Sequence, residues 1–219
     1  VAIDLSGMGD SDHRQNYSQA LYGEEIKAVC DDMNWDSADF LAHSMAGPIS
    51  VKAASTYPEL FKSLFLLDSI IIVPPDKARS FSGRGSMVRT DFVYEDLDSA
   101  VESFRLIPPQ PCRHDFLLKH IALNSFKETE SGWMLKSDGL IMKTYQYEDL
   151  TDIFMNLKCP IYLVYGLMSQ IFSQEILDYT KYVGNLSEEA VIGIPGAMHH
   201  LFIDEPIVFV EEIKKLLKK

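Results

Sequence analysis

Ser44 stands where an apolar run gives way to small residues, in the sequence Phe-Leu-Ala-His-Ser-Met-Ala-Gly at positions 40–47. A serine hydroxyl is a poor nucleophile unless a base removes its proton and the hydroxyl is held clear of the backbone. A sharp strand-to-helix turn gives that exposure, and it requires small residues two positions before and two after the serine. Ala42 and Ala46 occupy those positions, and Gly47 follows. This spacing predicts a nucleophilic serine on such a turn.

The same turn would bring the backbone N–H of Met45 to the start of a helix, where it can donate to an oxyanion. Small residues from position 45 to 57, with a break at Pro58, predict that helix. The competing interpretation is that Ser44 merely caps the helix. Two alanines where this kind of turn usually has glycine keep that alternative open.

Strands and helices alternate on both sides of Ser44. Short apolar runs predict strands at residues 1–5, 40–43, 63–67, 161–165 and 190–194, and helices at 17–33, 45–57, 174–183 and 206–217. Such alternation predicts an α/β fold with a mostly parallel sheet and helices on both faces. Residues 69–157 interrupt it with proline pairs and helical candidates at 97–106, 116–126 and 147–157. We therefore predict a core of residues 1–68 and 158–219 with a helical lid of residues 69–157.

Composition and charge exclude several partners. The 219 residues carry a net charge of −12, which disfavours nucleic acid and anionic membranes. The longest apolar stretch, residues 63–74, contains Asp68 and falls far short of the roughly 20 residues that span a bilayer. Cys30, Cys112 and Cys159 form no close pair and no metal-ligand spacing. We expect reduced thiols, no metal, no cofactor and a cytoplasmic location.

These landmarks resemble those of the α/β-hydrolase family, and they occur in the same order. Residues 3–11, Ile-Asp-Leu-Ser-Gly-Met-Gly-Asp-Ser, resemble the strand and loop before that family's first helix. Residues 42–47 resemble its nucleophile elbow, and residues 57–68 resemble the following helix end and strand. Residues 194–206, which contain Pro-Gly-Ala-Met-His-His and Asp-Glu-Pro, are similar to its histidine loop. The resemblance covers the chain outside the insertion and implies an esterase-like serine hydrolase.

His199 is the predicted general base. It follows a predicted strand and a glycine-containing turn just before the last helix, from where a histidine can reach a serine at the carboxyl end of the sheet. His200 is its nearest rival. His43, which precedes the serine, is expected to pack against the sheet.

Asp68 is the predicted third member, because the histidine needs a carboxylate to fix its tautomer. Many relatives carry that acid a few residues after the strand that corresponds to residues 161–165, but residues 166–170 contain no carboxylate. The first later acid, Glu175, is predicted to lie on a helix. Asp68 matches the family's other arrangement, at the end of the strand after the nucleophile helix. It also interrupts an apolar run, which is costly unless the carboxylate has partners.

The resemblance implies cleavage of a carboxylic ester or thioester through an acyl-serine intermediate, without a cofactor. An apolar lid would favour a small-molecule substrate, such as an acyl ester, with an acyl or alkyl group of moderate size. Candidate pocket or core residues of the lid are Phe104, Phe116, Leu117, Trp133, Met87 and Met142. The competing function is a non-catalytic, ligand-binding member of the same fold. The family's first strands have no counterpart before Val1, so we expect a missing N-terminal piece or a second copy of the chain as a partner.

Overall fold

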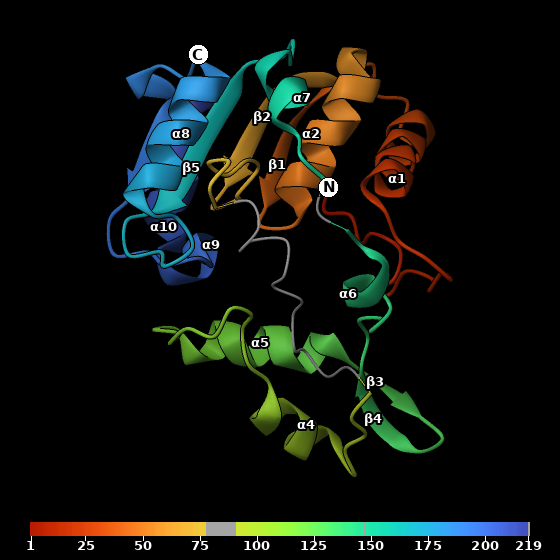
Figure 1. Ribbon diagram of the computed structural model, residues 1–219. Coiled ribbons are helices and arrows are strands. Elements are labelled where there is room, and N and C mark those ends of the chain that lie inside the picture. Colours follow the sequence, from red (N-terminus) through yellow and green to blue (C-terminus); the bar gives the residue numbers. More distant parts are fainter. Residues whose placement is uncertain (78–90, 147, 219) are drawn as a thin grey trace. The chain divides into compact units, whose positions relative to one another are not determined.

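The computed structural model describes residues 1–77, 91–146 and 148–218 (Figure 1). Its backbone contacts divide the chain into two compact units. One unit contains Val1–Ser18 and Arg84–Gln146, and the other contains Gln19–Gly83 and Tyr147–Lys219. In this division the N-terminal residues join the middle of the chain. The predicted boundaries, residues 1–68 with 158–219 against 69–157, stay a prediction.

The second unit is built on a parallel four-stranded sheet with the strand order β1-β2-β5-β6. Its strands are β1 (Ala38–His43), β2 (Phe61–Leu67), β5 (Ile161–Gly166) and β6 (Val191–Ile194). Register pairs His43 with Leu67, and Leu67 with Val164. Because all the strands run the same way, the residues that follow them gather at one edge of the sheet. In open α/β sheets this edge is where ligands bind.

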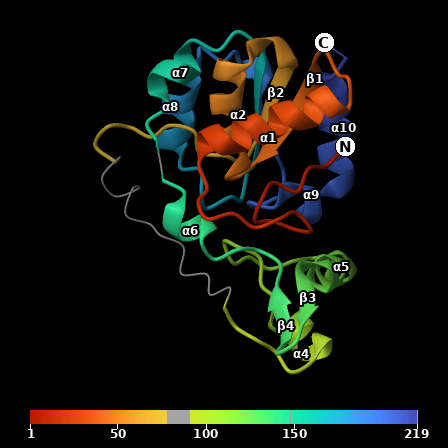
Figure 2. The same cartoon turned by 90° about the vertical axis from the view of Figure 1, so that its right-hand side faces the viewer.

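Helices cover both faces of this sheet. They are α1 (Gln19–Asp32), α2 (Ala46–Thr56), α7 (Thr151–Met155), α8 (Gln174–Gly184), α9 (Leu201–Asp204) and α10 (Pro206–Leu216), with 3₁₀ turns η1 (Pro58–Leu60) and η2 (Glu188–Ala190). Phe65 of β2 belongs to a buried cluster with Phe209 and Ile213 of α10. Leu64 and Leu66 alternate with it, point to the opposite face and are also fully buried. On the α2 side, α1 and α2 lie side by side (Figures 1 and 2).

The first unit combines short helices with an antiparallel hairpin. Its elements are α4 (Leu97–Ser103), α5 (Asp115–Ser125), β3 (Phe126–Thr129), β4 (Gly132–Leu135) and α6 (Ile141–Thr144) (Figure 2). The N-terminal loop is bonded into this unit. The N–H of Asp138 donates to the carbonyl of Gly7 at 2.8 Å, and the hydroxyl of Tyr17 donates to Asp138 Oδ2 at 2.5 Å. The hairpin was not part of the sequence interpretation, which predicted only helices here.

Residues 1–5 do not form the strand that their apolar pattern predicts. They are irregular, and no strand of the described residues pairs with them. Val1 is 87% exposed. A strand depends on a neighbour for its ladder of hydrogen bonds, which β-type residues alone cannot supply. That prediction was wrong.

Candidate active site

Ser44 lies on a sharp turn between β1 and α2, with a left-handed backbone φ of 52°. Hydrogen bonds hold this uncommon conformation. The N–H of Ser44 donates to the carbonyl of Leu67 at 3.1 Å. The carbonyl of Ser44 accepts from the N–H of Gly47 at 3.0 Å and from the hydroxyl of Ser69 at 2.5 Å. A Cβ atom at position 47 would collide with the Ser69 hydroxyl, which explains why glycine follows the turn.

The structure does not support the helix-cap interpretation of Ser44. The N-cap residue of α2 is Met45, and no side chain caps this helix. Within the described part of the chain, the Ser44 hydroxyl makes no hydrogen bond. The backbone N–H of Met45 stands at the helix start, where amide groups lack an intrahelical acceptor. This geometry leaves the hydroxyl and the neighbouring amide available to a substrate.

Asp68 follows β2 and is fully buried, with a left-handed φ of 43°. Its carboxylate accepts three hydrogen bonds. Oδ1 accepts from Nδ1 of His199 at 2.9 Å and from the hydroxyl of Ser169 at 2.7 Å. Oδ2 accepts from the N–H of Gly166 at 2.9 Å. The buried carboxylate thereby has the partners without which its burial would be costly.

The bond to Asp68 fixes the tautomer of His199. Because a carboxylate can only accept, Nδ1 carries the proton, and Nε2 of the neutral ring keeps its lone pair. His199 is 3% exposed, and its Nε2 is buried without a hydrogen-bond partner among the described residues. In the neutral ring this buried nitrogen has the lone pair with which a general base accepts a proton.

The loop that carries His199 is held close to the end of β5. Asp204, 2% exposed, accepts a hydrogen bond from the N–H of Met198 at 2.8 Å through Oδ2. A Cβ atom at Gly166 would collide with the carbonyls of Ala197 and Met198. Glycine at position 166 therefore permits the close approach that brings His199 to Asp68. The sequence analysis placed Asp204, the last residue of α9, in the histidine loop but gave it no role.

Ser44 and His199 are linked through their neighbours. Ser44 is bonded to Leu67, which precedes Asp68, and Nε2 of His43 lies 2.9 Å from the carbonyl of His199. No hydrogen bond joins the Ser44 hydroxyl to Nε2 of His199 within the described residues. Catalytic hydrogen bonds are often long without substrate and tighten in the complex. The structure thus joins the predicted acid and base directly, and it links the serine to Asp68 through the backbone of Leu67 and to His199 through the side chain of His43.

The rival residues occupy other places. Glu175 is exposed and forms an ion pair with Lys77. His200 packs its ring 4.9 Å from that of His199, and the three donors to Asp68 come from elsewhere. Burial, and then the neighbouring His199, lower the pKa of His43 from 6.5 to about 4, so its ring is neutral at neutral pH.

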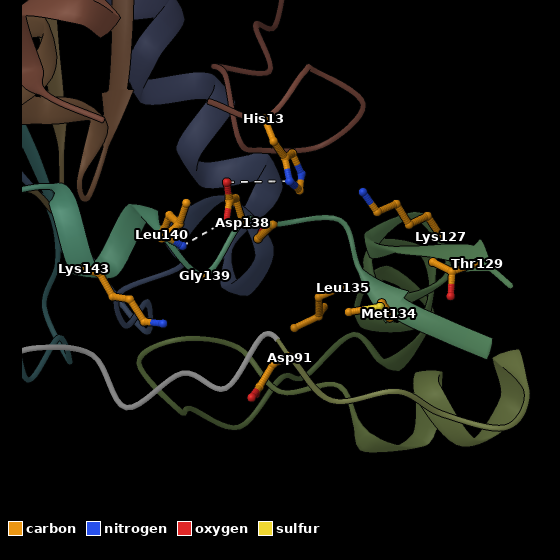
Figure 3. Close-up of a pocket in the computed structure, with 11 residues that line it drawn as sticks. His13, Asp91, Lys127, Thr129, Met134, Leu135, Asp138, Gly139, Leu140 and Lys143 are labelled. Carbon is orange, nitrogen blue, oxygen red and sulfur yellow. Dashed lines mark hydrogen bonds and ion pairs between the residues drawn. The ribbon is translucent and has the colours of Figure 1, made fainter. Parts of the chain in front are cut away.

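A separate cavity of about 680 Å³ lies within the first unit (Figure 3). Lys127 and Lys143 line it from opposite sides, with His13 and Asp138 on the wall between them. The five described lid residues that the sequence suggested are not among its lining, and Phe116 is 70% exposed. Met87 lies outside the described residues. The cavity is lined by the hairpin, the N-terminal loop, Asp91 and the segment of residues 137–143 that leads into α6, and the sequence suggested none of the lining residues themselves as pocket residues.

Neither a metal site nor a membrane span emerges from the described residues. No group of three or more His, Cys, Asp or Glu side chains is arranged to hold a metal ion within residues 1–77, 91–146 and 148–218. None of the helices in these ranges is long and apolar enough to cross a bilayer. Cys30, Cys112 and Cys159 are unpaired.

The chain belongs to the α/β hydrolase fold family, whose sequence model matches residues 1–206. It is 24% identical to pimeloyl-(acyl-carrier protein) methyl ester esterase of Wigglesworthia glossinidia brevipalpis, over 99% of this chain and 82% of that enzyme. A serine hydrolase-like protein of Danio rerio is 27% identical over 44% of the chain, but this match spans only 31% of that relative's length. The crystal structure of E-2-(acetamidomethylene)succinate hydrolase superposes with a TM-score of 0.81 at 20% identity, covering 98% of this chain and 80% of that one.

Family membership confirms the predicted fold class and the assignment to the α/β-hydrolase enzymes. Relatives that match the chain include esterases and hydrolases, which supports an ester-cleaving hydrolase. The roles of Ser44, Asp68, His199 and Met45 stay predictions.

Proposed function

We propose that the protein is a serine hydrolase that cleaves a carboxylic ester or thioester through an acyl-serine intermediate on Ser44. The observation that carries this proposal is the buried pair of Asp68 and His199, whose Nδ1 and Oδ1 lie 2.9 Å apart, while Nε2 of His199 has no hydrogen-bond partner among the described residues. The strained backbone of Ser44 beside this pair is the second support, since such strain concentrates at functional sites.

In the first half of the proposed reaction, Oγ of Ser44 attacks the carbonyl carbon while Nε2 of His199 takes the hydroxyl proton. The backbone N–H of Met45 donates to the oxyanion that forms. The bond to the leaving group then breaks, and Nε2–H returns the proton to the departing alkoxide or thiolate. Asp68 accepts from Nδ1–H throughout and stabilises the imidazolium.

In the second half, water attacks the acyl-serine and loses a proton to Nε2 of His199. The ester bond to Oγ of Ser44 breaks, the oxygen regains the proton, and the carboxylic acid leaves. The substrate is a small acyl ester or thioester, a proposal supported by the pimeloyl methyl ester esterase among the relatives. No metal or redox partner takes part in these steps.

The direct test is labelling by a fluorophosphonate together with hydrolysis of p-nitrophenyl acyl esters. Ser44→Ala should abolish both while the far-ultraviolet circular dichroism stays that of the wild type, because alanine fits between Ala42 and Ala46. Ser55→Ala is the matched control, since this serine of α2 is exposed and its hydroxyl donates to the carbonyl of Lys52 in its own helix. A wild-type protein that is neither labelled nor active would point to a non-catalytic, ligand-binding role instead.

The same assay assigns the base. His199→Ala should lower turnover by several orders of magnitude, and His200→Ala much less, because Asp68 accepts from His199. The opposite ranking would transfer the role to His200.

A further inference from the structure

We propose that His43 is a positioning residue, which holds the backbone of His199 in place so that Nε2 of His199 can meet the Ser44 hydroxyl when substrate binds. The proposal rests on the proposed function of Ser44 and His199. His43 is the last residue of β1 and the immediate neighbour of Ser44. One residue thereby connects the strand that leads to the serine with the loop that carries the proposed base.

The contact between His43 and His199 has a defined donor. Nε2 of His43 lies 2.9 Å from the backbone oxygen of His199, and a carbonyl oxygen can only accept. Nε2 of His43 therefore carries a proton. This bond satisfies a carbonyl next to a side chain that is 3% exposed, and an unpaired buried carbonyl would be costly.

Aromatic contacts fix the ring of His43 in the donating orientation. Its centroid lies 4.5 Å from that of His199 and 5.4 Å from that of His200. The ring of Phe202 meets it edge-on at 5.0 Å. These neighbours restrict rotation of the His43 ring, so its N–H keeps pointing at the His199 carbonyl.

His199 is consequently held at three points. Asp68 binds its Nδ1, His43 binds its carbonyl, and Asp204 binds the N–H of Met198 just before it. Without the bond from His43, the carbonyl of His199 loses this donor, while the bonds to Asp68 and Asp204 and the bond from the N–H of Met168 to the carbonyl of Ala197 remain. Displacing a catalytic group by about 1 Å can cost on the order of 100-fold in rate.

His43 acts without exchanging protons in the reaction. Its Nε2 is occupied by the His199 carbonyl, and burial keeps its ring neutral at neutral pH by lowering its pKa to about 4. A neutral ring beside His199 does not repel the imidazolium that forms there. The occupied Nε2 and the lowered pKa of His43 therefore favour a positioning role over the role of a second general base.

The test compares two variants that each keep one property of the histidine. His43→Phe keeps an aromatic ring and removes the donor, whereas His43→Gln keeps an N–H donor and removes the ring. With a p-nitrophenyl acyl ester, we expect His43→Phe to lower kcat about 10- to 100-fold, with KM changed less than about threefold. His43→Gln should recover most of the lost kcat. His120→Gln, at an exposed position of α5, is the control for losing a histidine.

The outcomes separate this proposal from the proposed function. A folded His43→Phe variant with wild-type kcat, or a His43→Gln variant as slow as His43→Phe, would overturn the positioning role while Ser44 stays the nucleophile. If His43→Phe does not fold, His43→Asn replaces it, since its shorter amide does not reach the carbonyl that His43→Gln reaches. If the wild type is neither labelled nor active, the proposed function fails and the positioning role falls with it.

Discussion

The hydroxyl of Ser69 donates to the backbone carbonyl of Ser44 at 2.5 Å, across the edge of the sheet where β1 and β2 end. Ser69 is fully buried and directly follows Asp68. Two consecutive residues after β2 therefore support two parts of the site. Asp68 binds the proposed base, and Ser69 binds the turn that presents the proposed nucleophile.

Ser69→Ala should weaken this turn. The Ser44 carbonyl would keep its bond from the N–H of Gly47 and lose the one from the side chain. We expect the free energy of unfolding to fall by about 1 kcal/mol, the usual net contribution of one hydrogen bond. Turnover should fall about tenfold, because the left-handed backbone of Ser44 would be less constrained. Urea unfolding and ester hydrolysis measure the two effects, with Ser55→Ala as control. Unchanged turnover would show that the turn holds its shape without Ser69.

The place of the acid gives a second prediction. Asp68→Asn should lower turnover by up to about 10⁴-fold, because it favours the wrong tautomer of His199. Ser169 stands after β5, where many relatives carry their acid, and its hydroxyl lies 2.7 Å from Oδ1 of Asp68. A carboxylate at position 169 should reach Nδ1 of His199, which is 2.9 Å from the same oxygen.

The double variant with Ser169→Asp and Asp68→Asn should therefore turn over at least about tenfold faster than Asp68→Asn alone, since it returns a carboxylate to the histidine. Adding Ser169→Ala instead is the matched control and should restore nothing. Steady-state kinetics of the three variants measure the effect. If the aspartate restores no more than the alanine, position 169 does not reach His199 in solution.

The sequence was informative where chemistry and local pattern coincide. The sharp turn at Ser44 could be predicted because small residues must flank it, and the hydrogen-bonded burial of Asp68 because a lone acid in an apolar run demands partners, whereas the catalytic roles of both stay predictions. The supporting bonds of Ser69 and Asp204 could not be predicted, because no sequence periodicity distinguishes a serine or aspartate that bonds to a nearby backbone from one that does not. The prediction of a strand at residues 1–5 was wrong for the opposite reason. Their apolar pattern is that of a strand, but pairing depends on a neighbour that no local pattern encodes.

Acid should destabilise the protein partly through His43. Its pKa is lowered from 6.5 to about 4 by burial first, with the neighbouring His199 and His200 adding to this and Asp68 opposing it. Between these two pH values the unfolded chain binds a proton at His43 that the folded chain excludes. Stability linked to this group is therefore fully present above about pH 6.5 and is lost as the pH falls toward 4. At pH 5 the loss relative to pH 7 should be about 2 kcal/mol.

His43→Gln removes the titrating ring and should remove that loss. Its free energy of unfolding, measured with urea, should fall about 2 kcal/mol less than that of the wild type between pH 7 and pH 5. His120→Gln, at an exposed position, should leave the wild-type difference intact. Parallel stability curves for the wild type and His43→Gln would mean that His43 titrates alike in both states. In that case the ring would be open to water rather than enclosed by His199, His200 and Phe202.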